Sequence, residues 1–254
     1  MKTEVGIVTE PHFFSYRVGA RFLETKEYIQ KVSPDETLSG ITERAIREGW
    51  FGSKSKDYAR RLVSALYSRI SEYRTGFALL KNSVDELEPL DLRMILHFQL
   101  HLSDPYYRWI TGVFFPERRR DGFLFVSVDE LSIAFAERVE TDVNSVTLRS
   151  YSSKILTLAR DLGILKGKSK KEFDSPIVSE KALLYILAVW QSLSLPLTDF
   201  LNFEFTNSVL DRQTLLRILD KGYSRKFWEY QLSEEYFSCT LFSEKVNELF
   251  RVGV

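Results

Sequence analysis

The stretch that decides the fold is Ser145-Val-Thr-Leu-Arg-Ser-Tyr-Ser-Ser-Lys-Ile-Leu-Thr-Leu-Ala-Arg-Asp-Leu-Gly-Ile-Leu-Lys-Gly-Lys-Ser-Lys-Lys171. Apolar residues recur at three- and four-residue intervals up to Leu162, which predicts an amphipathic helix over 145–162. Gly163 ends this helix, because glycine adopts the left-handed backbone that closes a helix without strain. Gly167 and the surrounding lysines predict a basic loop that follows the helix.

The residues that precede this stretch predict a strand and another helix. Phe123-Leu-Phe-Val126 is a short strand candidate, and Ser127–Val139 is a helix that begins with a Ser127-x-x-Glu130 capping box. Residues 140–144 form the turn between the two helices. The order strand, helix, turn, helix and basic loop looks like a winged helix over residues 119–178.

The 145–162 helix has one apolar face and one polar face. With about 100° per residue, Leu148, Ile155 and Leu158 fall on the face that can pack. The opposite face carries long donors with small hydroxyl neighbours, as a helix that enters a DNA groove requires. The predicted groove-facing residues are Arg149, Ser153, Lys154 and Arg160.

Charge is distributed unevenly along a chain whose formal net charge is zero. Residues 143–171 carry seven Lys and Arg side chains against Asp161 alone. We expect the lysines of the loop to contact flanking phosphates: Lys166, Lys168, Lys170 and Lys171. A second basic segment extends this track: Lys54, Lys56, Arg60 and Arg61. The alternative for both segments is a solvated surface without a ligand.

The flanking regions are predicted to be mainly helical. Residues 1–118 form a helical bundle domain, with helices at 11–31, 35–48, 55–80, 89–102 and 105–115. Residues 179–254 form a small α+β unit, with a buried helix from Ser179 to Trp190, a break at Pro196 and a helix over 211–221. A β-hairpin follows at 227–232 and 236–241. The predicted fold class is therefore mainly α.

Signals for an enzyme are weak. The single cysteine, Cys239, excludes intramolecular disulfides and Cys-based zinc sites, and it alternates in register with buried residues. His97 and His101 share a helix face but lack the glutamate of the usual zinc motif, so we expect core histidines. Glu24-Thr-Lys26 matches a nuclease-type pair without its partner aspartate. The sequence predicts no catalytic residue, no metal and no cofactor.

No segment is expected to enter a membrane. The longest apolar run, Ala182–Trp190, has nine residues, whereas a spanning helix needs about 20. The first 20 residues contain no continuous apolar stretch and do not resemble a signal peptide. Together with the lone cysteine, these features predict a cytoplasmic location.

Three segments together carry a family resemblance. The first is Ser53–Ile70, a basic helix of the form Ser-Lys-Ser-Lys-x-x-Ala-Arg-Arg-Leu-x-x-x-Leu-x-x-Arg-Ile. A second segment is Ile95-Leu-His-Phe-Gln-Leu-His-Leu-Ser-Asp-Pro-Tyr-Tyr-Arg-Trp-Ile110. The third is 145–165, with a Trp228-Glu-Tyr230 hairpin region near the carboxy terminus. As a pattern of spaced residues over most of the chain, they resemble the BrxA family of bacterial BREX phage-defence systems.

The resemblance implies a non-enzymatic accessory protein that binds double-stranded DNA and acts with other BREX proteins. It also implies an amino-terminal domain similar to the RNA-binding antitermination factor NusB. The residues themselves do not distinguish DNA from RNA. The alternative function is a protein–protein adaptor, in which the acidic regions 82–142 and 172–254 and the aromatic hairpin dock onto other defence subunits.

Overall fold

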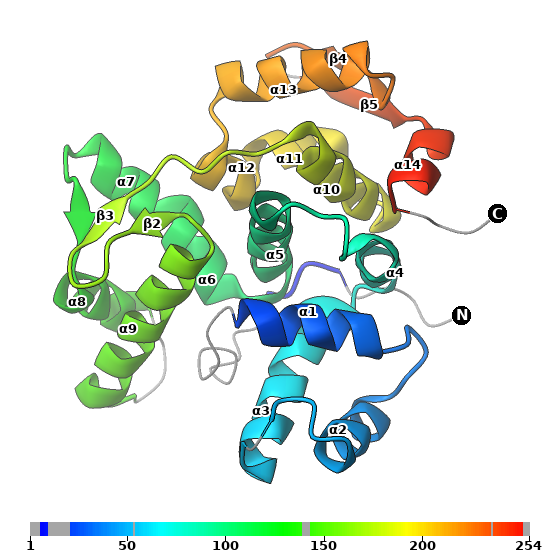
Figure 1. Cartoon of the computed structure of the whole chain (residues 1–254). Helices are drawn as coiled ribbons and strands as arrows, with labels where there is room; N and C mark the ends of the chain where they lie inside the picture. The colour runs from blue at the N-terminus through cyan, green and yellow to red at the C-terminus, as the bar shows by residue number, and fades with distance from the viewer. Residues whose placement is uncertain (1–5, 10–20, 53, 139–142, 235, 251–254) are drawn as a thin grey trace.

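Helices make up most of the computed structural model, and two small antiparallel sheets complete it (Figure 1). The structure describes residues 6–9, 21–52, 54–138, 143–234 and 236–250. The prediction of a mainly α chain is therefore confirmed.

The amino-terminal region holds six α-helices: α1 (Phe22–Lys31), α2 (Leu38–Arg47), α3 (Lys56–Leu66), α4 (Arg74–Ser83), α5 (Pro89–Ser103) and α6 (Pro105–Trp109). Residues 11–20 of the predicted first helix lie outside the described residues. The predicted helix over 55–80 is divided, because a π-helical turn at Tyr67–Ser71 ends α3 and α4 begins at Arg74.

Capping side chains decide where several of these helices begin. Thr37 accepts a hydrogen bond from the Gly40 amide, so α2 begins at Leu38, and the preceding Ser33-to-Glu36 contact only forms a turn. Asp104 accepts hydrogen bonds from two amides at the start of α6. A second π-helical turn, Ile110–Phe114, connects α6 to α7 (Phe115–Arg120), so the helical segment predicted at 105–115 extends further.

The second region holds β1 (Phe125–Val126), α8 (Val128–Arg138), α9 (Ser145–Asp161), β2 (Leu165–Lys166) and β3 (Lys171–Phe173). The three strands form an antiparallel sheet in the order β1-β3-β2. The predicted capping box is confirmed, since the Ser127 amide donates to Glu130 and the Glu130 amide donates to Ser127 Oγ. The last residue of the predicted helix, 139, and residues 140–142 of the predicted turn lie outside the described residues.

The carboxy-terminal region holds α10 (Glu180–Ser192), α11 (Leu197–Asn202), α12 (Glu204–Val209), α13 (Arg212–Ser224), β4 (Trp228–Leu232), β5 (Phe237–Leu241) and α14 (Ser243–Phe250). The predicted hairpin is confirmed, with Trp228 opposite Leu241 and Leu232 opposite Phe237. The sequence patterns missed α11, α12 and α14, which are six to eight residues long. Such short segments show too few turns for a clear helical period.

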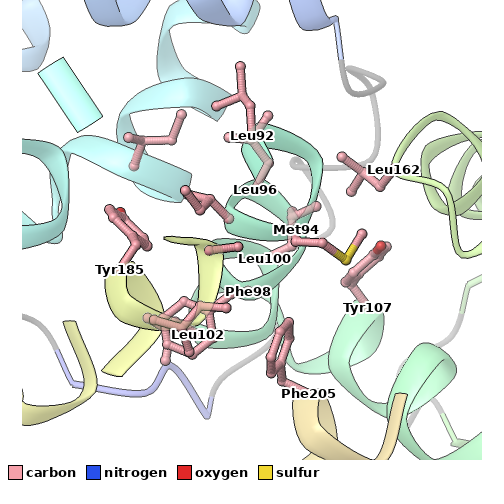
Figure 2. Packing of buried hydrophobic residues seen from close by; sticks show 14 of the residues in the cluster. Leu92, Met94, Leu96, Phe98, Leu100, Leu102, Tyr107, Leu162, Tyr185 and Phe205 are labelled. Carbon is pink, nitrogen blue, oxygen red and sulfur yellow. The ribbon is translucent and has the colours of Figure 1, made fainter. Parts of the chain in front are cut away.

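Helix α5 lies at the centre of the molecule (Figure 1). Nearly every residue from Asp91 to Leu102 is buried, so this helix is enclosed on all sides. Figure 2 shows its side chains beside Tyr107, Leu162 and Tyr185, which come from α6, the end of α9 and α10. The burial of Leu162 anchors the carboxyl end of α9 to the core and leaves the remainder of that helix to project outward (Figure 1).

Candidate nucleic-acid interface

Both ends of α9 are fixed by local hydrogen bonds. The Asn144 side chain accepts from the Thr147 amide at 2.8 Å and caps the amino terminus. At the other end the Ile164 amide donates to Ala159 O and the Gly163 amide donates to Arg160 O, both at 2.9 Å. This is the Schellman arrangement, and Gly163 adopts the positive φ of 82° that it requires. Gly163 therefore ends the helix, as predicted.

The predicted division of α9 into two faces is confirmed. Leu148, Ile155 and Leu158 are buried. The opposite face exposes Arg149, Ser153 and Lys154, with Ser150 between them. Small side chains next to long cations leave the helix backbone accessible, so this face can approach a curved anionic surface closely.

Two of the predicted α9 arginines are paired with carboxylates. Arg149 forms an ion pair with Asp129 of α8, and both side chains are more than half exposed. Arg160 is partly buried, and its Nε lies 3.0 Å from Asp161 Oδ1. The exposed Arg149–Asp129 pair contributes about 0–1 kcal/mol, so a phosphate can compete for Arg149.

Lys171 differs from the expectation that it lies on the surface beside phosphates. Its side chain is buried, and Nζ donates to Gly167 O at 3.2 Å and to Lys168 O at 2.5 Å. Burial lowers the pKa of this ammonium, and the Arg160 guanidinium lowers it further. The side chain closes the turn between β2 and β3 from inside. The sequence could not show this, because a lysine at the start of a strand can point to either face.

The other three lysines of the β2–β3 segment, Lys166, Lys168 and Lys170, are exposed. We call residues 165–173 the basic hairpin. Gly167 has a φ of 82°, and a Cβ there would lie 2.2 Å from Lys170 O, so only glycine fits this turn. Lys170 Nζ lies 4.3 Å from the centre of the Phe125 ring and 4.0 Å from Glu172, which holds it against β1.

The second predicted basic segment lies on a different helix. Lys54 precedes α3, and Lys56, Arg60 and Arg61 are exposed on its first turns. Asp57 pairs with Arg60 at 2.9 Å, and its carbonyl accepts from Arg61 Nε. Figure 1 shows α3 at the bottom of the molecule and α9 at the left, with α1 above α3. These cations therefore form a patch of their own at the outer end of α3.

One basic region was missed as a site. The predicted first domain ends at residue 118 and no site was predicted there, but Arg118, Arg119 and Arg120 form the last turn of α7. Arg119 and Arg120 line an open cleft of about 750 Å³, and Arg217 of α13 lines it as well. A run of three arginines is a signal that the sequence offered. Its closeness to α13, about 100 residues away in the chain, is a tertiary feature.

The histidine pair is part of the core, as predicted. His97 Nδ1 lies 2.9 Å from Tyr107 Oη, and Nε2 lies 2.9 Å from Ser208 Oγ. Because Ser208 uses its hydroxyl proton on Phe205 O, His97 Nε2 must be the donor in that contact. Likewise Thr111 donates to Tyr107 O, so His101 Nε2 donates to Thr111. Burial lowers the pKa of both imidazoles, which favours their neutral form.

The remaining candidate groups have structural roles. Burial raises the pKa of the Cys239 thiol to about 12. Trp228 is fully buried and donates from Nε1 to Leu219 O at 2.9 Å, so it offers no surface for a nucleobase. Glu24 pairs with Arg21, and Lys26 pairs with Asp85. Within the described residues, no three His, Cys, Asp or Glu side chains gather in a way that could hold a metal.

Within the described part of the chain, no helix has the length and apolar character needed to cross a membrane. A scan against protein-family models gives no match for this sequence. A search of curated proteins likewise gives no significant relative.

Proposed function

We propose that this protein binds double-stranded DNA through α9 and the basic hairpin, with little sequence preference. The observation that carries the proposal is the chain order β1, α8, α9, β2 and β3, combined with the sheet order β1-β3-β2. A winged helix has this order, with its recognition helix followed by a hairpin that forms the wing. In this assignment α9 is the recognition helix and the basic hairpin is the wing.

The chemistry of the exposed residues supports the same function. Phosphate contacts supply most of the affinity of a DNA-binding protein, and Lys and Arg side chains make them. The cations proposed to contact DNA are Arg149, Lys154, Arg160, Lys166, Lys168 and Lys170, together with Ser153 between them. Lys171 is not among the proposed DNA contacts, because its ammonium donates to backbone carbonyls inside the turn. The α3 cations are a second patch that the same DNA reaches only if it bends or is long.

We further propose that the protein is an accessory component of a BREX phage-defence system, of the BrxA family, and that residues 1–118 form a NusB-like bundle. The proposal rests on the spaced residues at 53–70, 95–110 and 145–165. The purified protein should then associate with BREX proteins expressed from the same operon.

Removing the exposed cations of the wing should weaken binding to every duplex sequence. We expect the Lys166→Ala/Lys168→Ala/Lys170→Ala variant to flatten the slope of log affinity against log salt by about 2.7 units, since each phosphate contact contributes about 0.9. The measurement is fluorescence anisotropy with a 30-base-pair duplex, titrated at several salt concentrations. Two unrelated duplex sequences should give the same change.

A matched control removes three cations elsewhere: Arg74, Lys226 and Lys245. Figure 1 shows α4 and α14 at the right of the molecule, whereas α9 lies at the left. This control should leave the slope near the wild-type value. Equal losses in both triple variants would mean that only net charge matters, and an unchanged slope in the first would remove the wing from the site.

The Asp129 carboxylate should act against DNA binding, because it neutralises Arg149. We expect Asp129→Asn to tighten binding about two- to fivefold, corresponding to the 0.5–1 kcal/mol of an exposed ion pair. Asp199→Asn removes an exposed carboxylate of α11 and is the control. Tighter binding by both variants to the same extent would assign the effect to net charge rather than to Arg149.

The adaptor function remains the second proposal, and one surface favours it. Phe123, Leu124 and Phe125 are consecutive exposed apolar residues, and β1 is an edge strand of its sheet. If the wild-type protein fails to bind the duplex at low salt, DNA binding by the isolated protein is discarded. Co-purification with BREX subunits that survives nuclease treatment and is abolished by Leu124→Asp would then establish the adaptor.

A further inference from the structure

A cleft of about 750 Å³ lies between α7 and α13. One wall is formed by the end of α7 and the other by the segment leading into α13. The residues that connect β3 to α10, Ser175 to Val178, lie between the two walls. Figure 1 shows α7 at the upper left, beside the chain that leaves β3 and near α12 and α13.

Three arginines from two helices line this cleft. Arg119 and Arg120 come from α7, and Arg217 comes from α13. Arg120 and Arg217 are exposed, whereas Arg119 is partly buried and donates to Asp174 O at 2.7 Å. The Arg119 guanidinium also lies 5.0 Å from the centre of the Phe173 ring, so β3 holds it in place at the edge of the cleft.

Three arginines outnumber the two acidic groups, Asp211 and Glu117, in the lining of the cleft. The Asp211 carboxylate caps α13, since Oδ1 accepts from the Thr214 amide at 2.7 Å and Oδ2 accepts from the Thr214 hydroxyl. These hydrogen bonds and the nearby charge of Arg217 lower the pKa of Asp211, so its carboxylate is ionised and offsets part of the Arg217 charge. Glu117, exposed on α7, is the second acidic side chain of the lining.

The cleft is close to the basic hairpin along the chain. Lys170 of the hairpin turn and Ser175 of the cleft are five residues apart, so at most about 17 Å separates their Cα atoms. Adjacent base pairs of B-DNA are 3.4 Å apart, so this distance corresponds to about five base pairs. No aromatic side chain lines the cleft, which disfavours stacking of free bases there and favours contacts with phosphates.

We infer that the cleft between α7 and α13 binds the sugar–phosphate backbone of the duplex beyond the part that α9 and the basic hairpin contact. Arg120 and Arg217 are the phosphate ligands. Arg119 keeps its hydrogen bond to Asp174 O and adds positive potential. This inference rests on the proposed function and extends the DNA site from the winged helix to the carboxy-terminal region. It also gives a role to a basic turn of α7 that the recognition helix leaves unused.

The test uses the full chain and the same 30-base-pair duplex. We expect Arg120→Ala/Arg217→Ala to flatten the salt slope by about 1.8 units, which corresponds to two lost phosphate contacts. In combination with the wing variant the losses should add to about 4.5 units. The matched control, Arg74→Ala/Arg225→Ala, removes two arginines outside the cleft, one of which pairs with Glu180, and should leave the slope unchanged.

A variant that removes a negative charge from the cleft is expected to have the opposite effect on binding. Glu117→Gln removes the opposing carboxylate, so it should tighten duplex binding about two- to fivefold. The double arginine variant and Glu117→Gln alter only exposed side chains. An unchanged thermal unfolding midpoint of each variant will show that the fold is intact.

The outcomes separate the inference from the function on which it rests. A normal slope in the cleft variant, with a reduced slope in the wing variant, overturns the inference and leaves the proposed function in place. A reduced slope in the cleft variant alone keeps the cleft as a DNA contact and removes the wing. No binding by the wild-type protein overturns both.

Discussion

Gly222→Ala should destabilise the protein by about 2–3 kcal/mol, although it replaces a glycine inside a helix. A Cβ at this position would lie 1.9 Å from Trp228 Cζ2 and 2.3 Å from Cε2. The indole cannot move away, because it is fully buried and Nε1 donates to Leu219 O of the same helix. Overpacking of this kind costs about 1–3 kcal/mol and occasionally more, which exceeds the gain of about 1 kcal/mol in helix propensity.

The control is Gly40→Ala in α2, where the nearest side-chain atom to a new Cβ is Thr37 Oγ1 at 3.4 Å. That substitution should be neutral or stabilising by up to about 1 kcal/mol. Urea unfolding followed by tryptophan fluorescence measures both variants. In the double variant with Trp228→Phe, the smaller ring should recover part of the loss at Gly222. Equal stability of the Gly222 and Gly40 variants would contradict the close packing of α13 on the hairpin.

Acidification from pH 7.5 to pH 5 should cost the protein about 4 kcal/mol of unfolding free energy through His97 and His101. Burial lowers the pKa of His97 to about 3 and holds the pKa of His101 well below its ordinary value. In the unfolded chain both histidines titrate near pH 6.5. The unfolded state therefore binds protons that the folded state does not bind. The contribution of the two neutral histidines to the free energy of unfolding is therefore fully present above about pH 6.5. It falls as the pH decreases, by about 2 kcal/mol per histidine at pH 5.

The measurement is a series of urea unfolding curves between pH 7.5 and pH 5. The His97→Gln/His101→Gln variant is the control, because its glutamines do not titrate and its stability should depend much less on pH. If this variant does not fold, imidazole proton shifts in nuclear magnetic resonance spectra of the wild-type protein decide the question. Titration of either histidine with a midpoint near 6.5 in the folded protein would contradict the neutral buried pair.

Local sequence signals were sufficient for the elements that surround the proposed site. The apolar period of α9, the stop at Gly163 and the capping box at Ser127 each depend on residues within a few positions of one another. Such signals act through backbone hydrogen bonds inside a single turn, so they can be recognised without knowledge of the rest of the chain. The buried histidines were also predictable, because they occur among apolar residues of one helix, and Cys239 was predictable because it alternates in register with apolar residues of its strand.

Other features depended on contacts that the sequence could not reveal. The π-helical turn at Tyr67–Ser71 divides a helix whose apolar period continues without interruption. Lys171 was predicted to be a surface cation, but its ammonium donates hydrogen bonds to the carbonyls of Gly167 and Lys168. Asp129 was part of an acidic region, but its position beside Arg149 depends on how α8 packs on α9.

By itself the sequence determined a mainly helical protein with an amphipathic helix, a glycine stop and a lysine-rich loop, since these follow from backbone geometry and side-chain period. Only the tertiary structure decided which cations are available to a ligand. Burial removed Lys171, ion pairs occupied Arg149 and Arg160, and the packing of α13 near α7 brought Arg217 to the cleft of Arg119 and Arg120. The physical reason is that charge acts through space, whereas helices and turns are specified along the chain.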